Sequence, residues 1–130
     1  MKDPYVGPDR RKFKRLQVSF IVFYKVDSPL HVRMLIGERE VNAIMLDLSE
    51  SGMGILTNYK MPESTLLSIK FILVNERTIS KERVRSMEIK GQVRYSALAE
   101  KGAYRIGIHF TDISEDDRDA IAYFVKMATL

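Results

Sequence analysis

The residues best suited to binding chemistry form a cluster of cations near the start of the chain. Arginine or lysine occupies five of the six positions from Arg10 to Arg15, and only Phe13 interrupts the run. A guanidinium group is planar and can donate two parallel hydrogen bonds, either to a phosphate or to the O6 and N7 atoms of guanine. Three residues separate Arg11 from Arg15, which leaves enough chain to wrap around a compact ligand. Taken alone, such a run is more often a solvated or nonspecific nucleic-acid tail.

A second polar cluster, Asp47-x-Ser49-x-x-Gly52, is expected where a strand ends. The Asp47 carboxylate can accept hydrogen bonds from the N1 and N2 donors of guanine, and the Ser49 hydroxyl can donate or accept. Gly52 can take a positive φ or admit a ligand close to the backbone. The same residue types are also typical of an ordinary hairpin turn, so this cluster alone does not specify a site.

The charge of the chain is concentrated at its start. Residues 1–15 contain six Lys or Arg and two Asp, so their net charge of +4 equals the formal charge of the whole chain. Residues 16–130 are therefore formally neutral. This asymmetry predicts an anionic partner at the N-terminal end, which is a nucleic acid, a phosphorylated small molecule or an anionic membrane surface.

Composition places the chain among globular proteins. At 130 residues, with 45% hydrophobic and 29% charged residues, it is long enough for one domain with a real core. The absence of cysteine excludes disulfides, thiolate metal sites and a cysteine nucleophile. No apolar run reaches the roughly 20 residues that cross a bilayer, and residues 1–4 lack the apolar stretch of a signal peptide. We therefore expect a cytoplasmic protein with no membrane insertion.

The elements that must position these clusters are mostly strands, because apolar and polar side chains alternate along much of the chain. In residues 41–49 we expect Ile44, Leu46 and Leu48 to face the core, so that Asp47 and Ser49 point to the opposite face. In residues 84–97 the expected core positions are Met87, Ile89, Val93 and Tyr95, and Gly91 marks a bend or bulge. The predicted strands are residues 17–26, 30–36, 41–49, 53–57, 67–73, 84–97 and 104–110.

The end of the chain has a different pattern, typical of a helix. Ser114 followed by Asp117 resembles a capping box, and Ile121, Phe124, Val125 and Ala128 recur at helical spacing. Six or more antiparallel strands with one terminal helix predict a mainly β fold, a small closed or nearly closed barrel. The expected organisation is a flexible basic leader over residues 1–15 and a single domain over residues 16–130.

Together, Arg11-x-x-x-Arg15 before the first strand and Asp47-x-Ser49-x-x-Gly52 at a later strand end resemble the two-part signature of PilZ domains. The resemblance covers nearly the whole chain, including the strand with Gly107 and the closing helix. It implies a six-stranded antiparallel PilZ-like β-barrel with a C-terminal α-helix, and binding of the bacterial second messenger cyclic di-GMP. The ligand-binding residues that it implies are Arg11, Arg15, Asp47, Ser49 and Gly52, with Arg10 as a helper and Arg94 as a candidate at the border of the site.

The function that this resemblance implies is that of a sensor that is not an enzyme. It would order its arginine segment on binding cyclic di-GMP and then signal to a separate protein partner, with no cofactor and no DNA partner. Two alternatives stay open: a PilZ-like interaction module that does not depend on ligand, and a nucleic-acid binder with a basic leader. The sequence leaves the oligomeric state open.

Catalysis and metal binding are not expected. Ser49 and Ser51 lack a Gly-x-Ser-x-Gly context and an identifiable base. His31 and His109 are the only histidines, are far apart in the chain, and have no cysteine to complete a metal site.

Overall fold

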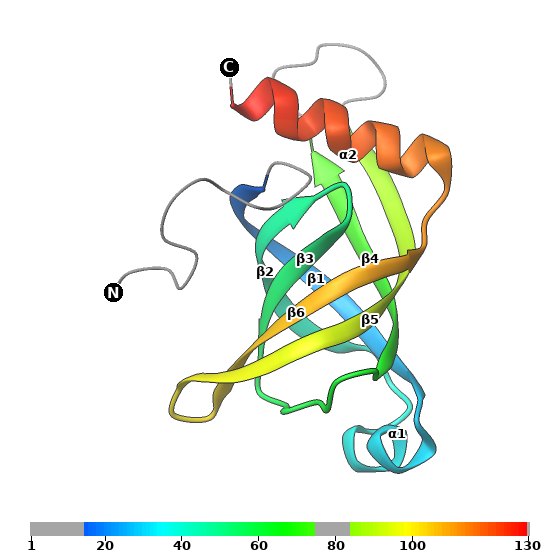
Figure 1. Ribbon diagram of the computed structural model, residues 1–130, viewed down its shortest axis with the longest axis vertical. Coiled ribbons are helices and arrows are strands. Elements are labelled where there is room, and N and C mark those ends of the chain that lie inside the picture. The colour runs from blue at the N-terminus through cyan, green and yellow to red at the C-terminus, as the bar shows by residue number, and fades with distance from the viewer. Residues whose placement is uncertain (1–14, 75–83, 130) are drawn as a thin grey trace.

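Six of the seven predicted strands form, and they pair antiparallel throughout the described residues, which are 15–74 and 84–129 of a computed structural model. Around the closed barrel the strand order is β1-β2-β3-β6-β5-β4 (Figure 1). The predicted mainly β barrel with a C-terminal helix is confirmed. The elements in chain order are β1 (Leu16–Ser28), α1 (Leu30–Ile36), β2 (Val41–Ser49), β3 (Gly52–Thr57), β4 (Leu66–Val74), β5 (Val84–Glu100), β6 (Ala103–Asp112) and α2 (Glu115–Ala128).

The barrel interior is filled by the inward side chains of every strand. In β4 the four predicted core positions, Leu67, Ile69, Phe71 and Leu73, are all buried. Removing one such side chain from water contributes about 1.5–3 kcal/mol, so this alternation determines which face of the strand turns inward. One polar pair lies within the core: the Tyr24 hydroxyl of β1 and the Thr57 Oγ1 of β3 are 2.8 Å apart.

The prediction of a strand over residues 30–36 is wrong, because this segment forms helix α1. The Pro29 carbonyl accepts hydrogen bonds from the amides of Val32 (3.2 Å) and Arg33 (3.1 Å), which starts a helical turn. Val32 is buried and Ile36 packs against the core, and their spacing of four residues matches one face of a helix. The segment therefore buries its apolar side by helical rather than by strand periodicity.

The predicted inward positions of β2 are only partly right. Met45 pairs with Ile55 of β3, and the next pair is Asp47 with Gly54, so two residues of β2 oppose one residue of β3. This β-bulge shifts the alternation: Met45 and Leu48 are fully buried, whereas Ile44 is 44% exposed. The core positions predicted for Ile44 and Leu46 are therefore wrong, and that for Leu48 is confirmed.

A similar shift changes the end of the long strand β5. The bulge predicted at Gly91 is confirmed, because the pairing with β6 slips between Lys90 and Gly91. A second slip follows Val93, and Tyr95 pairs with Gly107. Tyr95 is consequently 45% exposed instead of buried, so its predicted core position is wrong.

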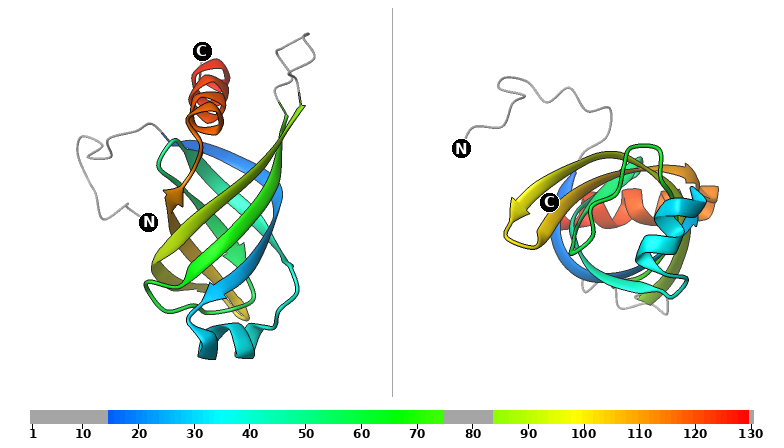
Figure 2. Two further views of the ribbon diagram at one scale, coloured as in Figure 1. Left: turned by 90° about the vertical axis from the view of Figure 1, so that its right-hand side faces the viewer. Right: turned by 90° about the horizontal axis from the view of Figure 1, so that it is seen from below.

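The two helices lie at opposite ends of the barrel (Figures 1 and 2). The predicted cap of α2 is confirmed, since the Ser114 side chain accepts a hydrogen bond from the Asp117 amide at 3.1 Å. Arg85 of β5 holds the Asp117 carboxylate with two hydrogen bonds, of 3.0 and 2.8 Å. In the described part of the chain, neither helix is long and apolar enough to cross a membrane.

Candidate ligand-binding site

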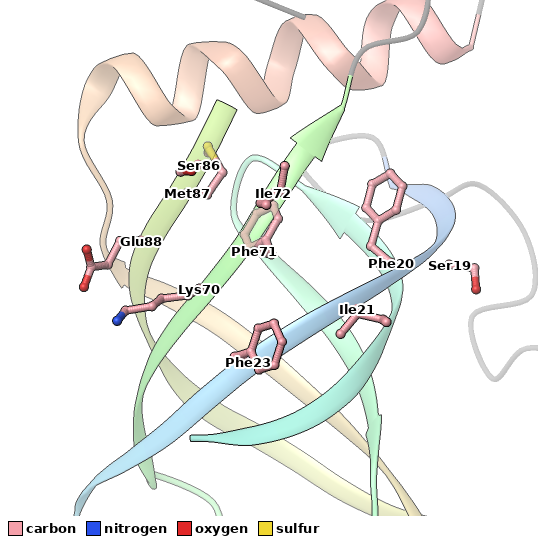
Figure 3. A pocket seen from close by; sticks show the side chains of 10 residues that line it. All are labelled: Ser19, Phe20, Ile21, Phe23, Lys70, Phe71, Ile72, Ser86, Met87 and Glu88. Atoms are coloured by element: carbon pink, nitrogen blue, oxygen red, sulfur yellow. The ribbon is translucent and has the colours of Figure 1, made fainter. Parts of the chain in front are cut away.

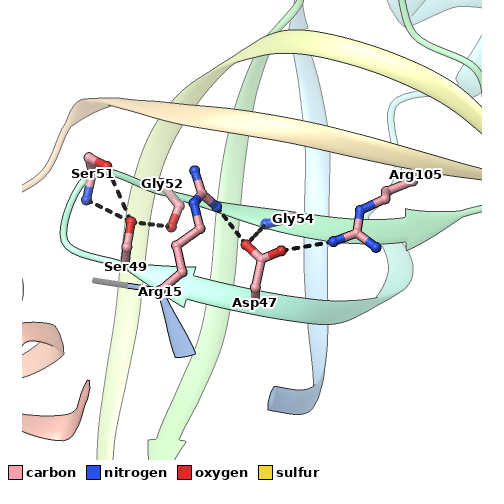
Figure 4. A network of polar contacts seen from close by, with 7 residues as sticks. All are labelled: Arg15, Asp47, Ser49, Ser51, Gly52, Gly54 and Arg105. Carbon is pink, nitrogen blue, oxygen red and sulfur yellow. Dashed lines mark hydrogen bonds and ion pairs between the residues drawn. The ribbon is translucent and has the colours of Figure 1, made fainter. Parts of the chain in front are cut away.

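The Asp47 carboxylate is the centre of a charged network on the barrel wall (Figure 4). Its Oδ1 accepts a hydrogen bond from Arg15 Nη1 at 2.6 Å and another from the Gly54 amide at 3.0 Å. Its Oδ2 accepts from Arg105 Nη2 at 3.1 Å. The Asp47 side chain is 12% exposed, against 28% for Arg15 and 48% for Arg105. The anion therefore lies below two cations that face solvent, and the cluster has a net positive charge.

Gly54 and Gly107 leave room for the side chains of Asp47 and Tyr95 to lie against the sheet. Asp47 pairs with Gly54 of β3, Gly54 with Gly107 of β6, and Gly107 with Tyr95 of β5, which gives one row across four strands. A Cβ on Gly54 would lie 2.8 Å from Asp47 Oδ2, and a Cβ on Gly107 would lie 2.0 Å from the Tyr95 ring. Side chains at these positions would push Asp47 and Tyr95 away from the wall.

Arg105 connects the Asp47 carboxylate to Tyr95. A hydrogen bond with the Tyr95 hydroxyl is the main cause that raises the pKa of Arg105, and the Asp47 carboxylate adds to it. Arg105 is therefore held as a cation between a phenol and a carboxylate. The Tyr95 ring is half-exposed beside it, so the site combines two guanidinium groups with one accessible aromatic face.

Ser49 and Gly52 shape the turn between β2 and β3. Ser49 is fully buried, and its hydroxyl donates to the Gly52 carbonyl at 3.4 Å and accepts from the Ser51 amide at 3.3 Å. A Cβ on Gly52 would lie 2.1 Å from the Ile108 carbonyl oxygen of β6. Gly52 is not among the glycines with positive φ, so close approach of β6 is the reason for glycine here.

The structure brings some of the predicted site residues together and leaves others apart. Arg15 and Asp47 form a direct ion pair, and Ser49 and Gly52 lie in the turn that follows Asp47. Arg94 is exposed in the bulge next to Tyr95 and is separate from the hydrogen bonds to Asp47 described above. Arg10 and Arg11 lie outside the described residues.

Three residues of the site were missed by sequence reasoning: Gly54, Tyr95 and Arg105. Arg105 occupies a polar position in the alternating strand 104–110, which was the available signal. Gly54 follows Gly52 by two residues, but only the pairing of β3 with β2 shows that it donates to Asp47. The described residues contain no group of three His, Cys, Asp or Glu that could hold a metal ion.

Comparison with protein families places the chain in a known family. The family model for the PilZ domain matches residues 9–126, which is nearly the whole chain. The chain belongs to the PilZ domain family. The match spans the basic segment from Asp9 onward as well as the Asp47 turn, so both parts of the signature lie within it. A comparison with curated proteins found no match.

Solved structures share the fold of this PilZ domain at low sequence identity. The Bacillus subtilis inhibitor of motility (MotI/DgrA) has a TM-score of 0.73 and 14% identity, over 94% of this chain and 52% of that one. The PilZ domain of YcgR from Escherichia coli, solved with c-di-GMP, has a TM-score of 0.57 and 15% identity, over 93% and 95%. The K. pneumonia MrkH–c-di-GMP complex has a TM-score of 0.58 and 14% identity, over 94% and 52%. This chain thus spans about half the length of MotI and of MrkH.

Proposed function

We propose that this PilZ domain is a bacterial cytoplasmic sensor that binds cyclic di-GMP and has no enzymatic activity. The observation that supports this most directly is the Asp47 carboxylate held under two solvent-facing arginines, Arg15 and Arg105. Arg15 is the second arginine of the Arg11-x-x-x-Arg15 motif and directly precedes β1. A doubly anionic ligand fits a site with this excess of positive charge.

Binding at this site requires an exchange of partners. Three donors already occupy the Asp47 carboxylate. A guanine that presents its N1 and N2 donors to Asp47 must therefore displace Arg15 or Arg105. The displaced guanidinium can then donate to a ligand phosphate or to guanine O6 and N7, so no charged group is left without a partner. Asp47 would hold the arginines before binding and a guanine after it.

Tyr95 and Arg105 extend the predicted set of ligand contacts. The half-exposed Tyr95 ring lies over Gly107 and beside Arg105. Aromatic rings in such positions stack with nucleobases, at about 1–3 kcal/mol per base. We expect a guanine of the ligand to stack on this ring, with Ser49 and Gly52 maintaining the turn at the other side of Asp47.

The mechanism that we propose is ordering of the N-terminal arginine segment over residues 1–15, with Arg10 and Arg11 closing over the ligand. The segment has clustered cations and few apolar residues, so folding without an anion is unfavourable. The newly placed segment would present a surface to a downstream protein partner. Hydrogen exchange tests this: amides before Leu16 should gain protection on adding cyclic di-GMP, and strong protection beforehand would contradict the switch.

Calorimetry with cyclic di-GMP tests the binding itself. Arg11→Ala and Arg15→Ala should each weaken binding by roughly 10 to 150 fold, whereas Lys12→Ala should change it much less. Equal effects at all three positions would mean diffuse charge rather than a specific site. Cyclic di-AMP is the matched control ligand, because adenine lacks the N1 and N2 donors that Asp47 would read.

The same calorimetry tests the first alternative, and a salt titration with nucleic acid tests the second. An interaction module that does not depend on ligand predicts no saturable heat with cyclic di-GMP. A nucleic-acid binder predicts that affinity for DNA or RNA falls steeply with salt and varies little with sequence.

A further inference from the structure

The barrel wall is open between β1 and β4 at the end near α2. The β1–β4 pairing begins at Ser28↔Leu66 and ends at Val22↔Phe71, although β1 starts at Leu16 and β4 continues to Val74. Among the described residues, the first part of β1 pairs with β2 alone, and Ile72–Val74 pairs with β5 alone. Figure 3 shows the two strands side by side at one end and diverging towards α2. Two strand edges thus face each other across a gap.

The gap is an apolar groove of about 750 Å³ between β1, β4 and β5. Phe20, Phe71 and Met87 line its inner part. Ile21, Phe23 and Ile72 line its outer part and are 66%, 40% and 54% exposed. The remaining lining residues are polar or charged: Ser19, Lys70, Ser86 and Glu88. Lys70 faces Glu88 across the strands and forms an ion pair with Glu40 at 3.8 Å, so the cation at the rim is already compensated and does not favour an anionic occupant.

We propose that this groove binds an extended segment of another protein, which adds as a strand between β1 and β4. Strand edges have backbone N–H and C=O groups that point sideways, and an extended peptide satisfies them through its own backbone. Alternate side chains of such a peptide point to opposite faces, so every second residue would enter the apolar interior of the groove. The occupant is therefore a neutral segment with large apolar residues at alternate positions.

The geometry favours a flexible segment over a second copy of this chain. The two edges face each other rather than outward, so a strand must enter the gap to reach them. In a second copy the corresponding edges lie inside its own gap, which prevents side-by-side pairing of two barrels. A single extended segment meets no such obstacle and can pair with both edges.

This inference goes beyond the proposed function. The groove is lined by residues of β1, β4 and β5, whereas Asp47, Gly54 and Arg105 lie on β2, β3 and β6. Peptide binding can therefore be measured without cyclic di-GMP, and failure of either site leaves the other intact.

The test uses the full chain and immobilised peptides of about eight residues, with Val, Ile, Leu or Phe at every second position. Control peptides have the same apolar residues in adjacent positions and a central proline. The tightest binders are then remade with N-methyl groups on alternate amides, which removes the backbone donors on one edge. We expect alternating peptides to bind, and N-methylation to weaken them by about tenfold or more.

Two protein variants locate the site. Ile72→Lys places a charge in the groove and should weaken peptide binding by about tenfold or more. Leu98→Lys is the matched control, because Leu98 is an exposed apolar residue of β5 outside the groove, and its effect should be under about twofold. Hydrogen exchange should show new protection within residues 19–23 and 70–74.

Three results would overturn the proposal. The first is that no alternating peptide binds better than the proline controls. The second is binding that N-methylation leaves unchanged, which would mean that the strand edges are not used. The third is a concentration-dependent dimer in sedimentation that Ile72→Lys abolishes, which would assign the groove to a second copy of the chain.

Discussion

The wall formed by β2, β3 and β6 and the seam between β1 and β4 differ in which groups they expose. On the wall formed by β2, β3 and β6, a carboxylate lies beneath two arginines and has three hydrogen-bond donors. At the β1–β4 seam the ladder ends early, and Ile21 and Ile72 are exposed at 66% and 54%. In the first region the buried carboxylate has hydrogen-bond donors on both oxygens. The second region is an apolar gap between two strand edges.

The difference shows that a closed barrel need not be uniformly closed. Gly52 lets β3 approach β6 closely and Gly54 lets the Asp47 side chain lie on β3, so this side is continuous and holds its charged groups against the wall. The other side retains backbone groups and apolar side chains that a partner can use. Inside the barrel, the hydrogen bond between Tyr24 of β1 and Thr57 of β3 connects the two regions.

The largest expected effect comes from disrupting the tight side. Gly52→Ala places a methyl group 2.1 Å from the Ile108 carbonyl oxygen, so β3 and β6 must separate. We expect urea denaturation to show a loss of about 3 kcal/mol in the free energy of unfolding. Ile72→Ala on the open side is the comparison, with an expected loss under about 1 kcal/mol. Equal losses for the two variants would remove the distinction between the regions.

The next effect concerns the connection between the two sides. Burial raises the pKa of Tyr24 from 10.0 to about 12, with the hydrogen bond to Thr57 acting in the opposite direction. The folded state therefore holds the phenol proton more tightly than the unfolded state, so this stabilisation is complete below pH 10 and is lost as the pH rises to 12. The free energy of unfolding should fall by about 2–3 kcal/mol over this window.

Tyr24→Phe is the control for that pH dependence. The variant should be less stable by about 1 kcal/mol at neutral pH, because the hydrogen bond to Thr57 is lost. Its stability should decline less than that of the wild type between pH 10 and 12, as measured by denaturation at each pH. Parallel curves for the two proteins would show that Tyr24 is not the group that titrates.

A smaller effect is expected at Arg105, on the polar side. Arg105→Lys keeps the charge and removes the planar fork that meets Asp47 and Tyr95. Cyclic di-GMP affinity should fall by about tenfold, equivalent to about 1.4 kcal/mol, as measured by calorimetry. Arg94→Lys is the matched change at a solvent-exposed arginine and should alter the affinity by less than about twofold. A larger loss of affinity for Arg94→Lys than for Arg105→Lys would indicate that the ligand binds beside the β5 bulge rather than at Asp47.

The smallest effect is expected on the open side. Ile21→Thr replaces an exposed apolar side chain with a β-branched polar one that suits a strand. Unfolding free energy should change by no more than about 0.5 kcal/mol, and cyclic di-GMP affinity should not change. A larger loss of stability would indicate that Ile21 packs more firmly than its exposure suggests.

Much of the fold could be predicted from the sequence because burial imposes a simple period. Residues 67–73 alternate without interruption, and Ser114 caps its helix as expected. The errors at Ile44, Leu46 and Tyr95 arise at register shifts, which depend on the opposing strand and leave no mark in the strand itself. Segment 30–36 has apolar residues compatible with both periods, so only its packing decides for a helix.

The site was predictable to the extent that its residues belong to the two sequence motifs. Arg15 and Asp47 were identified from their motifs, and they do meet. Arg105 and Tyr95 reach the network from β6 and β5, so their contribution depends on strand order and on Gly107. The roles of Arg10 and Arg11, and the division into leader and barrel, stay predictions.

The diverging edges at the β1–β4 seam also bear on the solubility of the protein. A sheet edge that faces outward can recruit the edge of another molecule and start aggregation, which proteins counter by covering, shortening or charging their edges. Here the two edges point at each other across the groove, with Lys70 and Glu88 among its lining residues. Whole barrels cannot stack through such edges, although one slender strand can enter. We therefore expect this arrangement to limit edge-to-edge self-association at high concentration while the groove stays open to a single strand.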